Sequence, residues 1–259
     1  MTTPLSYYGG KQKLASKIIP LIPKHTLYCE PFIGGGAIFF AKPQSEIEVI
    51  NDTNKELVNF YRVVQNDFVG LEKEIRITLH SRDLHRKAQV IYDNPDMFSE
   101  LKRAWAVWVL SSQSFSSKLD GSWGYDRSKQ HTTKKITNKR SSFTEEYAIR
   151  LQNVQIECAD ALRIIESRDS AASFFYCDPP YYNSNMGHYD GYTLDDFEKL
   201  LKILSKITGH FVLSSYPSEI LTDFTKRFNW KHQEFVQQVS VSVHKKNARK
   251  KVEVLTYNC

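Results

Sequence analysis

Short apolar or alternating runs recur along the chain, and between them apolar residues repeat with the three- to four-residue spacing of amphipathic helices. The runs that predict strands are 25–30, 46–51, 154–158, 173–178, 210–214, 235–243 and 252–258. The segments that predict helices are 13–22, 34–41, 54–65, 97–112, 145–152, 161–167, 193–207 and 218–227. Strands separated by helices of this length predict an α/β fold with a doubly wound, mostly parallel sheet.

The middle of the chain, residues 67–142, breaks this alternation. It is rich in charged and aromatic residues and contains the predicted helix 97–112, which loop-like sequence follows. We therefore expect a mainly helical insert over 67–142, whose helices pack on one another. Residues 1–66 and 143–259 are then expected to form a single α/β domain.

Composition and charge suggest a partner. With 41% hydrophobic and 25% charged residues, the chain has the composition of a soluble globular protein, and its net charge of +6 suits a polyanion. Residues 127–140 carry six Lys or Arg and no acid, and residues 245–251 carry five. Either run could be a solvated loop, but two of them favour contacts with phosphates. The candidate side chains are Arg127, Lys129, Lys134, Lys135, Lys139, Arg140, Lys245, Lys246 and Arg249.

Several other classes of protein are disfavoured. The four cysteines, Cys29, Cys158, Cys177 and Cys259, lie far apart and lack a metal-binding spacing, so we expect neither a metal site nor a disulfide framework. No apolar stretch is long enough to span a bilayer, and the N-terminus lacks the pattern of a secretion signal. We expect a cytoplasmic protein without membrane contact, and a monomer, since no self-complementary segment is visible.

The tetrapeptide Asp178-Pro179-Pro180-Tyr181 follows the apolar run Ser173–Cys177, at the end of a predicted strand. The Asp178 carboxylate and the Pro179 carbonyl can both accept hydrogen bonds from an exocyclic amino group. The prolines lack N–H groups and fix φ, so the turn is stiff. The Tyr181 ring offers a face on which a base can stack after leaving a duplex. The alternative is a tight turn that only follows a buried strand.

A second set of candidate residues lies near the start of the chain. The segment Glu30-Pro31-Phe32-Ile33-Gly34-Gly35-Gly36 joins a predicted strand to a helix, and its glycines let the backbone approach a ligand closely. Further on, Asp52 ends a strand, where a carboxylate can bind the hydroxyls of a ribose. Asp160 is a candidate nucleoside contact. Either aspartate could instead be a helix N-cap.

These motifs occur in a fixed order: Tyr7-Tyr8-Gly9-Gly10-Lys11, the glycine turn, Asp52, a variable middle, and the tetrapeptide. In this order and spacing they resemble the D12 class (alpha group, Dam-like) of S-adenosylmethionine-dependent DNA adenine-N6 methyltransferases. The resemblance spans almost the whole chain. It includes Lys250-Lys251-Val252-Glu253-Val254-Leu255, which is similar to the closing strand of that family.

The resemblance implies a Rossmann-like class I methyltransferase fold, with S-adenosyl-L-methionine as the cofactor. It implies that residues 67–142 are a target-recognition domain for double-stranded DNA. The catalytic residues it implies are Asp178, Pro179, Pro180 and Tyr181. The cofactor-binding residues it implies are Tyr7, Lys11, Glu30, Pro31, Phe32, Gly34, Gly36, Asp52 and Asp160.

One segment departs from the family pattern. Dam-like enzymes that read GATC carry a Pro-Phe-Gly turn, whereas this chain has Gly121-Ser122-Trp123-Gly124-Tyr125, so GATC is not expected as the target. We expect methylation of N6 of a flipped adenine, in a bacterial or phage-infected cell, with restriction–modification as one setting. Two alternatives stay open: methylation of cytosine N4, whose amino group has the same geometry, and a catalytically silent DNA-binding module.

Overall fold

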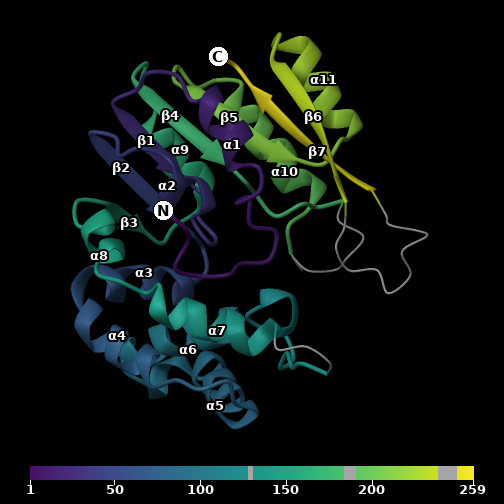
Figure 1. Ribbon diagram of the computed structural model, residues 1–259. Coiled ribbons are helices and arrows are strands. Elements are labelled where there is room, and N and C mark those ends of the chain that lie inside the picture. Colours follow the sequence, from purple (N-terminus) through teal and green to yellow (C-terminus); the bar gives the residue numbers. More distant parts are fainter. Residues whose placement is uncertain (128–130, 184–190, 239–249) are drawn as a thin grey trace. The chain divides into compact units, whose positions relative to one another are not determined.

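Seven strands form one sheet in the order β3-β2-β1-β4-β5-β7-β6 in the computed structural model, which describes residues 1–127, 131–183, 191–238 and 250–259 (Figure 1). The strands are β1 (Leu27–Glu30), β2 (Ile47–Asn51), β3 (Gln155–Glu157), β4 (Ser173–Cys177), β5 (His210–Ser215), β6 (Lys231–Gln238) and β7 (Lys250–Tyr257). β4 pairs in parallel with β1 and β5, whereas β7 is antiparallel to β5 and β6. The predicted α/β fold with a mostly parallel sheet is confirmed.

Each helix that the sequence predicts has a counterpart, and further helices lie in the predicted insert 67–142. The helices are α1 (Ala15–Ile18), η1 (Ile19–Leu21), α2 (Ala37–Ala41), α3 (Lys55–Asn66), α4 (Phe68–Arg76), α5 (Arg82–Asp93), η2 (Pro95–Met97), α6 (Glu100–Gln113), η3 (Phe115–Ser117), α7 (His131–Ser141), α8 (Glu146–Leu151), α9 (Ala161–Arg168), α10 (Leu194–Leu204) and α11 (Glu219–Arg227). Thr193 begins α10 as the N-cap, in a reciprocal capping box with Asp196. The predicted strand 235–243 begins earlier, at Lys231, and its residues 239–243 lie outside the described residues.

The described residues form two compact units. The first unit consists of Met1–Ala15, Ile33–Pro43 and Ile50–Cys158, and the second unit of Ser16–Phe32, Gln44–Val49 and Ala159–Cys259. This division is based on contacts between residues, and its bounds do not coincide with those of the predicted insert 67–142. A separate target-recognition role for residues 67–142 therefore stays a prediction.

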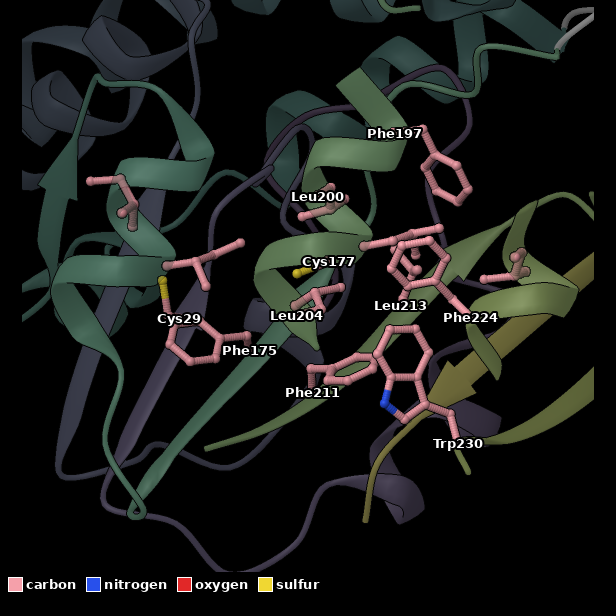
Figure 2. Close-up of a cluster of buried hydrophobic side chains, with 14 of the residues drawn as sticks. Cys29, Phe175, Cys177, Phe197, Leu200, Leu204, Phe211, Leu213, Phe224 and Trp230 are labelled. Atoms are coloured by element: carbon pink, nitrogen blue, oxygen red, sulfur yellow. The ribbon is translucent and has the colours of Figure 1, made fainter. Parts of the chain in front are cut away.

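The core of the second unit surrounds β4, whose residues are all buried. Figure 2 shows the cluster of apolar side chains, with labels on Cys29, Phe175, Cys177, Phe197, Leu200, Leu204, Phe211, Leu213, Phe224 and Trp230. Within it, Phe211 of β5 meets Trp230 edge-on, with 4.9 Å between ring centroids. The tetrapeptide 178–181 begins at the carboxyl end of the buried strand β4.

In the first unit, α6 is the most deeply buried helix. All residues from Ala104 to Gln113 are buried, so the helix must be covered on every side, and it contacts α3, α4, α5 and α7. Near its start, Arg103 forms two hydrogen bonds with Glu56 of α3, from Nε to Oε2 at 2.8 Å and from the terminal nitrogen to Oε1 at 2.6 Å. Ser99 caps the helix, which explains why it begins after the predicted boundary at residue 97.

Part of the first basic run is a helix, α7, and not the solvated loop that was the alternative. The Asp126 carboxylate accepts hydrogen bonds from the backbone N–H groups of Thr132 at 2.9 Å and Thr133 at 3.1 Å, which lowers the pKa of Asp126 to about 2. A negative charge beside the free N–H groups of a first turn stabilises a helix. The buried side chain of Ile136 anchors one face of α7.

Loss of Arg103 is expected to destabilise the protein, because the Glu56 side chain is only 9% exposed and would lose both hydrogen bonds. We expect Arg103→Ala to lower the free energy of unfolding by about 2 kcal/mol, measured by urea denaturation. Arg76→Ala is the matched control, since Arg76 pairs with Glu72 on a helix surface and should contribute less than about 0.5 kcal/mol. Equal losses in the two variants would contradict this account.

Candidate active site

The tetrapeptide 178–181 continues directly from β4. Pro179 and Pro180 have no N–H to donate, so strand hydrogen bonding stops there. Pro179 is buried, while Asp178 and Tyr181 are half-buried. The turn therefore presents a carboxylate and an aromatic ring at the carboxyl end of a buried strand, where α/β proteins bind ligands.

The Tyr181 hydroxyl lies between two carboxylates. It is 3.1 Å from Asp178 Oδ1 and makes a short hydrogen bond to Oε1 of Glu253 in β7. The Tyr181 ring meets Tyr216 edge-on, with 4.4 Å between centroids. Burial, followed by the charges of Asp178 and Glu253, raises the pKa of Tyr181 well above its ordinary value. Tyr181 is therefore a neutral phenol that keeps its proton.

Glu30, the last residue of β1, is a second buried carboxylate, only 1% exposed. The Tyr28 hydroxyl donates to Glu30 Oε1 at 2.5 Å, and burial together with the Glu30 charge raises the pKa of Tyr28. Because Cys29 is the parallel partner of Phe175, the ends of β1 and β4 are neighbours. Beyond Glu30, Pro31 is buried and Phe32 packs against the core of the second unit. The second unit thus brings Glu30 and the tetrapeptide to adjacent strand ends.

The cysteine nearest the tetrapeptide is not suited to nucleophilic chemistry. Burial, followed by the charges of Asp178 and Glu30, raises the pKa of the Cys177 thiol far above neutrality. Among the described residues, no cluster of His, Cys, Asp and Glu is suited to a metal ion. No helix in the same ranges is long and apolar enough to cross a membrane.

In the first unit, the glycine turn 34–36 packs against Tyr7. Gly34 and Gly36 have φ values of +48° and +68°, which favour glycine. A Cβ on Gly34 would lie 3.2 Å from atoms of the Tyr7 ring, and the Tyr61 hydroxyl donates to the Gly34 carbonyl at 2.7 Å. The turn is therefore fixed by neighbouring tyrosines in a conformation that requires glycine.

Asp52 joins this turn to the start of α3. Its Oδ2 accepts from the Gly34 N–H at 3.0 Å and its Oδ1 from the Asn54 N–H at 2.9 Å. Burial raises the pKa of Asp52 in spite of these hydrogen bonds. The side chain of Asn54, and not that of Asp52, caps α3, so the N-cap alternative for Asp52 is wrong.

Lys11 and Asp160 are each held by local hydrogen bonds. Lys11 is buried and its Nζ donates to the Gly9 carbonyl at 3.0 Å. Asp160 is exposed and caps α9, accepting from the backbone N–H groups of Leu162 at 2.9 Å and Arg163 at 3.1 Å. The capping alternative is thus confirmed for Asp160, while a cofactor contact from either residue stays a prediction.

Aromatic and cationic side chains stack in the segment that precedes α7. Trp123 lies nearly parallel to Tyr125, 5.5 Å between centroids, and the guanidinium of Arg82 is 4.8 Å from the Trp123 centroid. His80 lies 4.9 Å from Trp123 on the centroid measure, and Arg127 donates to the Tyr125 hydroxyl at 3.1 Å. Trp123 is therefore a packed aromatic, whereas Tyr125, 48% exposed, reaches the surface.

The other basic candidates differ in exposure. Lys134 and Lys135 are exposed on α7, and Arg140 donates to the Thr78 carbonyl at 3.0 Å. The Lys139 ammonium is buried without a hydrogen-bond partner among the described residues. Burial, with the charge of Lys135, lowers the pKa of Lys139 to about 7. The candidates outside the described residues are Lys129, Lys245, Lys246 and Arg249.

Sequence reasoning missed Glu253, Tyr28 and Arg82. A sign of Glu253 was present, since it lies two positions before the fully buried Leu255 and so on the same face of β7. An acid on the inward face of a strand calls for a partner. Tyr28 and Arg82 carry no comparable signal, because their partners become evident only in the folded protein.

Comparison with known proteins adds to this geometry. A family model described as D12 class N6 adenine-specific DNA methyltransferase matches residues 7–251. The type II methyltransferase M.MjaIII of Methanocaldococcus jannaschii is 28% identical over 261 residues, which cover 88% of this chain and 89% of that protein. The type II methyltransferase M1.LlaDCHI of Lactococcus lactis subsp. cremoris is 28% identical over 251 residues, covering 85% and 83%.

A DNA adenine methylase of Vibrio cholerae is 25% identical over 237 residues, which cover 86% of this chain and 83% of that protein. Among solved structures, a precorrin-8w decarboxylase from Methanobacterium thermoautotrophicum superposes with a TM-score of 0.43 and 8% identity over the whole chain. A likeness this loose carries no argument about either fold or function.

The buried ammonium of Lys139 predicts a pH dependence of stability. Its pKa is about 7 in the folded protein against an ordinary 10.5, so the unfolded chain binds more protons between these values. The contribution of Lys139 to the free energy of unfolding should therefore rise with pH across this window. Lys139→Met should reduce the rise, measured by urea unfolding at pH 7 and pH 9. The control Lys134→Met, at an exposed position of α7, should retain the rise in the free energy of unfolding. An equal change between pH 7 and pH 9 in both variants would contradict the effect of Lys139.

Proposed function

Because the chain belongs to the family of D12 class N6 adenine-specific DNA methyltransferases, we propose that it moves a methyl group from S-adenosyl-L-methionine to N6 of an adenine flipped out of double-stranded DNA. The observation that carries the proposal is the Asp178 carboxylate, which follows the buried strand β4, contacts the Tyr181 hydroxyl and precedes two prolines. Family membership favours adenine N6 over cytosine N4, and an enzyme over a silent DNA-binding module.

The adenine amino nitrogen is a weak nucleophile, because its lone pair is delocalised into the ring. The Asp178 carboxylate and the Pro179 carbonyl would each accept a hydrogen bond from one of its two N–H groups. These hydrogen bonds favour a pyramidal nitrogen with a directed lone pair. Bound S-adenosylmethionine supplies a methyl group activated by a positively charged sulfur. The protein then has to contribute position and electrostatic support, and the Asp178 carboxylate can take up the proton that the nitrogen loses.

The Tyr181 ring would support the flipped base. Its hydroxyl contacts Asp178 and Glu253 and its ring is braced by Tyr216, so the ring is fixed before any ligand arrives. A fixed aromatic face lowers the cost of holding an unstacked base.

The residues proposed to contact the cofactor are Tyr7, Lys11, Glu30, Pro31, Phe32, Gly34, Gly36, Asp52 and Asp160. Two observations support a fit. The left-handed glycines allow the backbone to come close to a ligand. The Asp52 carboxylate accepts backbone N–H groups on both oxygens and, because each oxygen carries two lone pairs, it has acceptor capacity left for a ribose hydroxyl.

DNA binding is assigned to the insert 67–142. Exposed Lys134 and the Arg127–Tyr125 pair are suited to phosphates, and the net charge of +6 favours a polyanion. We also propose that the protein acts as a monomer in the cytoplasm of a bacterial or phage-infected cell. A restriction–modification setting is proposed because two of its relatives are type II methyltransferases.

Asp178→Ala is expected to lower kcat by at least about a hundredfold while binding of S-adenosylmethionine persists. Transfer of tritiated methyl to unmethylated genomic DNA measures activity, nucleoside mass spectrometry identifies the product, and calorimetry measures cofactor binding. The control is Asp223→Ala, at an exposed position of α11. Near-native methyl transfer by Asp178→Ala would refute the role of Asp178. If the labelled product is N4-methylcytosine, the substrate is cytosine. A wild-type protein without methyl transfer would refute the proposed function.

Asp52→Ala is expected to weaken binding of S-adenosylmethionine by about tenfold or more, because hydrogen bonds from the ribose to a charged group would be lost. Calorimetry compares this variant with Asp93→Ala, which removes an exposed carboxylate from α5. Circular dichroism checks that the glycine turn and α3 survive the change. An unaltered affinity would remove Asp52 from the cofactor site.

A further inference from the structure

Glu253 is a buried acid for which the methyl-transfer mechanism has no direct use. It lies in β7 and is only 6% exposed. An ionised carboxylate in such a position requires hydrogen-bond donors. The Tyr181 hydroxyl is one of them, through a short contact with Glu253 Oε1. The acid is therefore linked, through a single phenol, to the tetrapeptide.

The geometry gives that phenol two acceptors and one proton. Asp178 Oδ1 is 3.1 Å from the Tyr181 oxygen, and the contact with Glu253 Oε1 is shorter. A tyrosine has a single O–H to donate. Burial keeps Tyr181 from ionising, so Asp178 and Glu253 compete for this one proton.

We propose that Glu253 is a positioning residue for methyl transfer. By accepting the Tyr181 O–H, it competes with Asp178 Oδ1 for this proton and so favours a hydrogen bond from the amino group of the base to Asp178. It also fixes the Tyr181 ring, which Tyr216 braces on another side at 4.4 Å. This inference rests on the proposed function, because it assigns Asp178 the role of an amino-group acceptor.

An apolar replacement separates this role from simple structural support. Glu253→Leu removes the charge and the acceptor together and fills their place with an apolar side chain of similar size. In this variant the Tyr181 O–H has Asp178 as its remaining acceptor of the two. Glu253→Gln keeps an amide oxygen that can accept the same hydrogen bond.

The experiment measures kcat and KM for methyl transfer to DNA by the full chain. We expect Glu253→Leu to lower kcat by about tenfold with KM values within about twofold, the loss expected for one hydrogen bond to a charged group. Glu253→Gln should restore most of kcat. Adding Tyr181→Phe to Glu253→Leu should raise kcat again, because the competing hydroxyl is then absent. The control is Glu234→Leu, exposed on β6 opposite Val254.

Each alternative outcome is informative. An unchanged kcat in Glu253→Leu would overturn the proposal, as would a double variant whose loss is the product of the two single losses. If Glu253→Leu does not fold, the kcat values of Glu253→Gln and Tyr181→Phe are measured instead. A kcat of Glu253→Gln as low as that of Asp178→Ala would then overturn the proposal. A wild-type chain without methyl transfer would instead refute the proposed function.

Discussion

Carboxylates that are buried away from water need hydrogen-bond donors in its place, and in the second unit tyrosines are among these donors. Tyr28 donates to Glu30, and the Tyr181 hydroxyl lies between Asp178 and Glu253. In both tyrosines burial raises the pKa, so each stays a neutral donor. A phenol stabilises a carboxylate without cancelling its charge. This suits the proposed function, in which the site attracts amino hydrogens and a cationic methyl donor.

The fold and the location of the candidate site could largely be predicted from the sequence, because both depend on local patterns. The continuous apolar run 173–177 predicted β4, and the Thr193 cap predicted the start of α10. The tetrapeptide and the glycine turn could be placed because their prolines and glycines constrain the backbone by themselves. The predicted start of α6 was early, because the capping signal of Ser99 was not used.

What could not be predicted depends on contacts between distant segments. Asp52 has the sequence position of a helix cap, yet Asn54 takes that role and leaves Asp52 to join α3 to the glycine turn. The helix α7, which contains part of the first basic run, is capped by Asp126, whose carboxylate accepts hydrogen bonds from N–H groups of the helix. Glu253 binds the hydroxyl of Tyr181, which lies 72 residues earlier in the chain. Neither the residue types nor the spacing of apolar residues could indicate this pairing.

The position of β7 has a consequence for the order of folding during synthesis. The end of β5 at Ser215 and the start of β7 at Lys250 are 35 residues apart, a length that a ribosome adds in roughly 2 to 7 seconds. During that interval β5 has no partner on the side that β7 later occupies between β5 and β6. The nascent chain thus carries the complete tetrapeptide beside an open strand edge, a surface prone to pairing with other chains. Insertion of a single late strand closes that edge and delivers the acceptor for Tyr181 at the same moment.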